Sequence, residues 1–124
     1  MANELSYSAA FTFQKGNLKE MAESFIGLVS NIAGTVCMHN NLSVGTSEEA
    51  IQLGEVTAAK AFIVIHNQDD TNYVEFRDGT GASNDVVYIP PRGVVMFFMG
   101  TDVTAPYLVA NTAACLVEYW IIPD

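Results

Sequence analysis

The sequence has few charged residues, and basic ones are especially scarce. Charged residues make up 15% of the 124-residue chain, whereas their usual share is about 25%. Only five residues are basic, and they are scattered: Lys15, Lys19, Lys60, Arg77 and Arg92. Binding to nucleic acid requires several cations on one face. The sequence therefore argues against nucleic acid as a partner and, for the same reason, against a membrane surface.

Acidic residues give the chain a formal net charge of −9, and they are as dispersed as the basic ones. They form no acidic tail of the kind that serves as an interaction segment. We expect this charge to favour solubility and to repel the chain from DNA.

Cysteine is also scarce, and long apolar runs are absent. Two cysteines are too few for the dense disulfide framework of a small secreted domain. Cys37 and Cys115 both have apolar neighbours, so we interpret both as small buried side chains. The N-terminus has no basic segment followed by an apolar run, which predicts no signal peptide. No apolar segment approaches the ~20 residues that span a membrane, so we expect a protein made and kept in the cytosol, or in something assembled there.

What the sequence does contain is apolar material in short runs. Half of the residues are hydrophobic, and a chain of this length buries roughly two-thirds of its unfolded surface. We therefore expect one domain with its own core. Turn signals separate β-rich runs at short intervals, which is typical of a sandwich or barrel. The expected strands are residues 8–13, 35–39, 61–66, 73–77, 86–89, 94–99 and 115–122.

Two stretches are ambiguous between helix and strand. Apolar residues from Leu18 to Val29 fit helical spacing, and Asn17 with Glu20 resembles a capping box. Residues 24–32 also fit a strand, so we favour a short capped turn followed by a strand. Residues 46–49 similarly predict a single turn. The resulting prediction is an all-β fold, an antiparallel sandwich of about eight strands.

Two of the expected strands differ in how their apolar residues are arranged. Residues 73–77 alternate, which directs Val74 and Phe76 inward. Residues 94–99 are apolar on both faces, although a sandwich strand has only one face toward the core. We therefore expect the second face of that strand to be covered, by loops of the chain or by another subunit.

The chain lacks every arrangement of residues that we associate with catalysis or metal binding. The metal-ligand types Cys37, His39, His66 and Cys115 have no zinc-site spacing. No serine or cysteine lies in a nucleophile motif. The adjacent acids Glu48–Glu49 and Asp69–Asp70 point to opposite sides of an extended chain and form no acid–base pair. The loop at 78–85 matches neither an EF-hand nor a phosphate cradle. We predict no catalytic residue, no metal and no cofactor, and therefore not an enzyme.

Several stretches together resemble a known group of proteins. They are residues 5–17, 44–50, 65–75, 105–107 and 110–119. Over residues 5–122 the arrangement resembles small β-sandwich virion proteins of tailed bacteriophages. The resemblance implies a jelly-roll-like sandwich, a trimer or larger ring, and a structural role without catalytic residues. It is compatible with capsid decoration, neck or tail.

These observations lead to a functional expectation. We expect a capsid decoration or cement protein, made in the host bacterial cytoplasm, that binds the major capsid protein or other virion proteins and forms a homo-oligomer, most simply a trimer. The alternatives are a tail, neck or fibre-base component, and a carbohydrate-binding attachment module that uses exposed Tyr or Trp side chains. We expect residues 1–124 to form a single sandwich with an N-terminal arm of about residues 1–8. The candidate intersubunit contacts are Ala2, Asn3, Leu5, Tyr7, Met96, Phe97, Phe98, Met99 and Tyr107.

Overall fold

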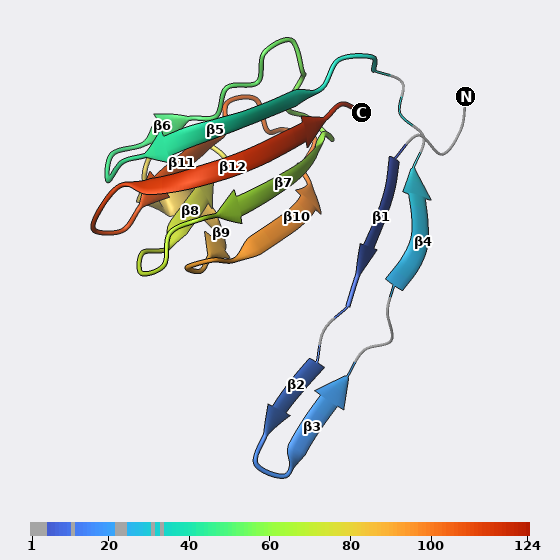
Figure 1. Cartoon of the computed structure of the whole chain (residues 1–124). Helices are drawn as coiled ribbons and strands as arrows, with labels where there is room; N and C mark the ends of the chain where they lie inside the picture. Colours follow the sequence, from blue (N-terminus) through green and yellow to red (C-terminus); the bar gives the residue numbers. More distant parts are fainter. Residues whose placement is uncertain (1–4, 11, 22–24, 31, 33) are drawn as a thin grey trace. The chain divides into compact units, whose positions relative to one another are not determined.

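The computed structural model of the chain describes residues 1–124 except 1–4, 11, 22–24, 31 and 33 (Figure 1). Contacts divide the chain into two compact units, Met1–Ala33 and Gly34–Asp124. Each unit is described by itself below.

The first unit consists of two antiparallel two-stranded ladders. Strand β1 (Leu5–Ala9) pairs with β4 (Phe25–Ser30), and β2 (Thr12–Lys15) pairs with β3 (Leu18–Met21). Gly16 lies in the turn between β2 and β3 with φ of 58°, a conformation that glycine adopts without steric cost. The expected strand at 8–13 is thus divided between β1 and β2.

Two expectations concern this unit, a capped turn and an N-terminal arm. The capped turn expected to begin at Leu18 is wrong, because these residues form strand β3. The helical spacing misled because the apolar residues from Leu18 to Val29 belong to two separate strands, β3 and β4. Of the expected arm, Leu5 to Ser8 lie within β1, whereas Ala2 and Asn3 lie outside the described residues.

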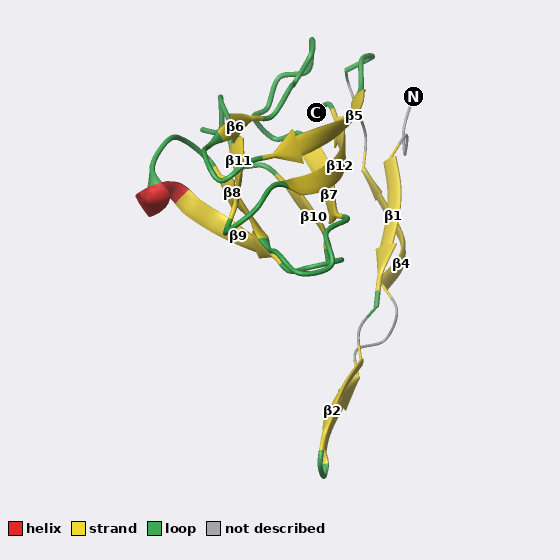
Figure 2. Ribbon diagram, turned by 60° about the vertical axis from the view of Figure 1, so that its left-hand side comes forward, coloured by secondary structure: helices red, strands yellow, loops and turns green. Residues whose placement is uncertain are grey.

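The second unit is a sandwich of two four-stranded antiparallel sheets. One sheet has the order β10-β7-β12-β5 and the other has the order β6-β11-β8-β9 (Figures 1 and 2). A single 3₁₀ turn, Ala82–Asn84, precedes β9. The strands are β5 (Met38–Val44), β6 (Glu49–Ala50), β7 (Phe62–Asn67), β8 (Val74–Arg77), β9 (Asp85–Ile89), β10 (Val94–Phe98), β11 (Tyr107–Ala110) and β12 (Cys115–Ile122).

The order of these strands is that of a jelly roll. Successive strands alternate between the two sheets, except that β8 and β9 form a hairpin within one of them. Two four-stranded sheets connected in this way place the first strand, β5, beside the last, β12. The expected all-β, antiparallel, jelly-roll-like sandwich is confirmed, with eight strands in the second unit.

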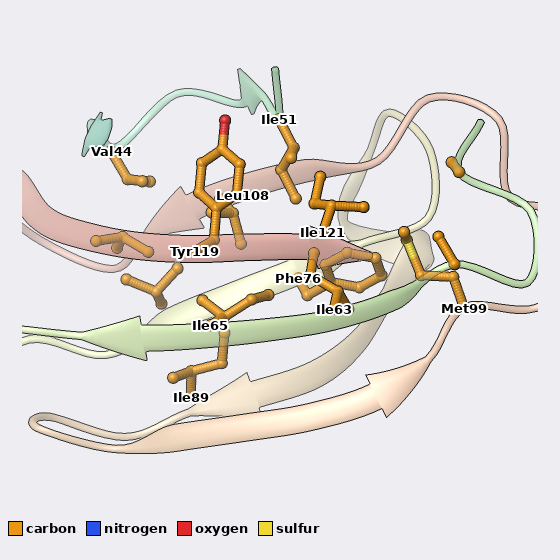
Figure 3. Close-up of a cluster of buried hydrophobic side chains, with 14 of the residues drawn as sticks. Val44, Ile51, Ile63, Ile65, Phe76, Ile89, Met99, Leu108, Tyr119 and Ile121 are labelled. Atoms are coloured by element: carbon orange, nitrogen blue, oxygen red, sulfur yellow. The ribbon is translucent and has the colours of Figure 1, made fainter. Parts of the chain in front are cut away.

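The core lies between the two sheets of the sandwich (Figure 3). Strands β7 and β12 contribute alternate residues from one side, and β8 and β11 contribute residues from the other. Val74 and Phe76 are buried, which confirms the inward direction expected for them. Phe76 meets the ring of Phe97 edge-on, with ring centroids 5.1 Å apart and an interplanar angle of 80°. Buried side chains that face one another here include Val44, Ile63, Ile65, Leu108, Tyr119 and Ile121.

Two buried polar side chains fasten loops to this core. The Tyr119 hydroxyl accepts a hydrogen bond from the Gln52 N–H (2.9 Å) and donates one to the Gln52 carbonyl (3.1 Å). The Asn67 amide donates to the carbonyls of Asn72 (2.9 Å) and Pro90 (3.2 Å). Each side chain therefore joins a strand to backbone groups of residues that lie outside the strands.

Several strand boundaries and one burial prediction differ from expectation. Strand β5 begins at Met38, so Cys37 precedes it and is exposed, contrary to its predicted burial. Cys115 is buried as expected. Strand β6 begins at Glu49, the last residue of the turn expected at 46–49. Strand β11 was not predicted. Because β11 directly follows Pro106 and has only four residues, its sequence resembles the end of a loop.

Candidate interaction surface

The outer face of the β10-β7-β12-β5 sheet carries two adjacent rows of apolar residues. The strand register places Met96, Val64 and Trp120 in one row across three strands. The next row contains Phe98, Phe62 and Ile122. Because side chains alternate between the two faces of a sheet, all six residues lie on the outer face, and we call them the apolar half-sheet.

Strand β10 carries three exposed apolar side chains on this face. Val94, Met96 and Phe98 are 54%, 41% and 44% exposed, whereas Val95 and Phe97 are packed against the core. Several large apolar side chains exposed side by side on one strand are typical of a contact surface. Single exposed apolar side chains, in contrast, are normal on any protein. One apolar face of this strand therefore joins the core and the other faces outward, and the expected cover of the outer face by loops or by another subunit stays a prediction.

Beyond the apolar half-sheet, the same face becomes polar. The register places His66, Glu118 and Asn41 in one row. His39 stacks flat on Trp120, with ring centroids 4.7 Å apart and planes 4° from parallel. The Nε2 atom of His39 lies 2.8 Å from an Oε2 oxygen of Glu118. This arrangement holds the Trp120 ring in place and gives the face an aromatic group beside a carboxylate.

The outer face of the other sheet is organised around an arginine. Arg77 pairs with Glu48 at 3.3 Å and with Asp85. The hydrogen bond and the charge of this guanidinium lower the pKa of Asp85. The pKa of Glu75 is raised, chiefly by its hydrogen bond with Asp85. Because these ion pairs join β8 to β9 and to the residue before β6, we interpret the cluster as a structural feature.

The predicted contact residues fall into four groups. Met96 and Phe98 lie on the outer face. Phe97 is directed to the core and Met99 is buried, so these two have the surroundings of core residues. The half-buried ones lie elsewhere: Tyr107 on β11, and Leu5 and Tyr7 on β1. Ala2 and Asn3 lie outside the described residues.

Sequence reasoning missed other exposed apolar residues. Val94 and Leu116 lie on this sheet, and Val86 and Tyr88 lie on β9 of the other sheet. Tyr88 contacts Tyr73 through tilted rings 4.9 Å apart. Strict alternation around Val94 and Leu116 would have identified both, once the inward residues of β10 and β12 were fixed by the core.

The part of the chain that the structure describes contains no helix long and apolar enough to cross a membrane. Within those same residues, no three side chains of His, Cys, Asp or Glu gather as ligands of a metal ion would. A shallow hollow of about 330 Å³ lies at the start of the sandwich unit, lined by residues 34–36, 55–57 and 123–124 among others. It contains hydroxyls and carboxylates on an open surface and no arrangement that points to a ligand.

The comparisons with known proteins add little to this description. No family model matches the chain, and no curated protein matches it. One solved structure, from the Bacillus endospore appendages, described as disulfide-linked pili, is similar over 72% of this chain and 87% of its own. The TM-score is 0.39 at 9% identity, which is too low to carry an argument about fold or function.

Proposed function

We propose that this chain is a structural protein of a tailed-phage particle, a decoration or cement protein that binds the outer shell and stabilises it. The observation that carries the proposal is the row of exposed apolar side chains on β10, at the edge of a sheet whose outer face carries two adjacent rows of apolar residues. Soluble monomers rarely expose contiguous apolar patches, whereas an assembly is stabilised when such a patch is buried between its subunits.

The proposed mechanism is the summation of many small contacts. Burial of apolar surface contributes roughly 25 cal/mol per Å² removed from water, and symmetry repeats each contact around the particle. Repetition converts modest single contacts into strong attachment through avidity. The net charge of −9 agrees with a position outside the shell, away from packaged DNA.

Copy number tests this proposal directly. Quantitative mass spectrometry of purified virions would give the ratio of this chain to the major shell protein. A ratio equal to that of the shell subunit, or to a simple fraction of it, is the result expected of a decoration protein. A handful of copies per particle would instead assign the chain to the tail, neck or fibre base. Absence from particles would refute the structural role.

A carbohydrate-binding attachment module is the second candidate, because Trp120 lies on an outer sheet face and stacks on His39, which contacts the Glu118 carboxylate. Trp120→Ala would then abolish binding on a glycan array while the fold persists. Tyr88→Ala is the matched control, since Tyr88 is an exposed aromatic residue on the other sheet. An array without signal for the unaltered chain would exclude this candidate.

A further inference from the structure

The sandwich has four sheet edges, and two of them carry features that hinder pairing with another chain. β6 is only two residues long. β9 begins with the charged Asp85, shifts its register against β8 at Val86, and ends at a pair of prolines. The third edge strand, β5, pairs regularly and has no Asp, Glu, Lys or Arg, but its outer face carries the exposed polar residues His39, Asn41 and Ser43 rather than apolar ones. Short strands, charges, prolines and irregular pairing are the devices that keep sheet edges from associating.

The fourth edge, β10, has none of these devices. Its sequence is Val-Val-Met-Phe-Phe, without a charge, a proline or a glycine, and among the residues that the structure describes its only strand partner is β7, with which it pairs in regular register. A regular, apolar and exposed edge strand is a template for the addition of another strand. Figure 1 shows β10 at the outer side of its sheet, next to β7.

The hydrogen-bond pattern shows which groups of β10 face outward. The Asn67 N–H donates to the Gly93 carbonyl, and the Met99 N–H donates to the Ala61 carbonyl. In an antiparallel ladder, bonded and non-bonded residue pairs alternate. Val95 and Phe97 therefore direct their backbone groups toward β7, whereas Val94 and Met96 direct theirs to the open edge.

We propose that β10 is the site of self-association, where two copies of this chain pair their β10 strands antiparallel across a two-fold axis centred on Met96. The two sheets then join into one continuous eight-stranded sheet. This inference deepens the proposed assembly role by naming its first contact, and it concerns the isolated chain as much as the particle.

Pairing with a second copy, rather than with an unrelated strand, is favoured by self-complementarity. An antiparallel register centred on Met96 sets Met96 opposite its own copy and Val94 opposite Phe98 of the other copy. It also sets Arg92, whose guanidinium pairs with Asp70 of its own chain, opposite Gly100 of the other copy. The two-fold axis makes each of these contacts twice, and the uncharged strands approach without repulsion although the chain carries −9 overall.

Disulfide trapping tests this register. Two residues in a hydrogen-bonded antiparallel pair have Cα atoms about 5.5 Å apart, within the range of about 4.4–6.8 Å that a disulfide spans. In a Cys37→Ser background, which removes the exposed thiol, Met96→Cys should form a covalent dimer on mild oxidation. Val86→Cys is the matched control: it is exposed and lies on the protected edge strand β9. It should stay monomeric on a non-reducing gel.

Mass measurement tests the association without any cross-link. Light scattering after size exclusion should give an even number of copies for the unaltered full-length chain. Met96→Lys places a charge at the centre of the pairing strand and should reduce the mass to that of one chain, with an unchanged circular dichroism spectrum. Val86→Lys should leave the mass of the oligomer unchanged.

The proposal is overturned by a monomeric or trimeric mass for the unaltered chain, or by a Met96→Lys variant that keeps its mass. It is also overturned if Met96→Cys does not dimerise, since two β10 strands paired around Met96 would hold the two thiols within disulfide range. None of these results would change the copy number measured in virions, so the proposed assembly role can hold even if the β10 pairing is refuted. If the chain is absent from virions but pairs through β10, the assembly role fails alone.

Discussion

Removing a single oxygen atom from Tyr119 should weaken the fold measurably. The hydroxyl is fully buried at the centre of β12, where it exchanges two hydrogen bonds with the backbone of Gln52. It also accepts one from the Asn40 side-chain amide at 3.2 Å. Figure 3 shows the Tyr119 ring in the core, with its oxygen pointing toward the segment that carries Ile51. Tyr119→Phe keeps the ring and its packing, so the loss is confined to these three bonds.

The size of the effect follows from the surroundings of the partners. A hydrogen bond contributes about 1 kcal/mol net, and a buried group left without a partner costs about 1–3 kcal/mol. Asn40 and Gln52 are only partly buried, so water replaces some of what is lost. We therefore expect a loss of about 2 kcal/mol. With a urea m-value of about 1.5 kcal/mol per M, the midpoint should fall by about 1.3 M.

Urea titration followed by tryptophan fluorescence measures this shift, because Trp120 is adjacent to Tyr119 and is the single tryptophan. Tyr88→Phe is the control: Tyr88 is exposed, so the same chemical change should move the midpoint by less than about 0.3 M. Equal midpoints for Tyr119→Phe and the unaltered chain would refute the reasoning, because the Gln52 segment would then be held by packing alone.

Three further predictions concern charge, backbone and thiols. The pKa of Glu75 is raised, chiefly by its hydrogen bond with Asp85, so this group stabilises the fold below its ordinary pKa of 4.5, and the contribution is lost as pH rises through the raised value. Glu75→Gln should therefore raise the Tm near about pH 7 and give no gain near about pH 4, and the opposite order would contradict the assignment. Gly93→Ala should cost about 2 kcal/mol, because the new methyl group would lie 2.7 Å from Pro90, whereas Gly100→Ala meets nothing closer than 3.9 Å and should be nearly neutral in the same urea assay. A thiol reagent should modify Cys37 in the native protein and Cys115 only after unfolding, since Cys115 is buried and burial raises its pKa; rapid native reaction of both would show that the sandwich opens near Cys115.

The sequence was most informative where a strand is long or strictly alternating. Residues 115–122 form β12 with the predicted bounds, because an eight-residue run with a proline stop has few other interpretations. Val74 and Phe76 are buried as predicted, because alternation on a short strand assigns faces without any knowledge of its partner. The class of fold follows from many such runs, each separated by a turn.

Short elements and element ends were not predictable in the same way. β3 and β11 have four residues each, too few for a period to emerge. The exposure of Cys37 depends on where β5 begins, which is decided by its pairing with β12, far away in the sequence. The candidate contact strand was found from its composition, but the division of its residues into Met96 outside and Phe97 inside requires knowledge of the core.

The position of β12 has a consequence for how the sandwich forms in the cell. β12 lies at the centre of its sheet, between β7 and β5, yet it is synthesised after every other strand of the sandwich. Until it emerges from the ribosome, β5 has no neighbour and the inner residues of β7 lack half of their cover. Nearly all of the contacts that complete the fold join distant parts of the chain, which makes folding slow. The nascent protein therefore exposes apolar strands for longer than a helical protein of equal size, and its yield should depend on chaperones that bind such strands during translation.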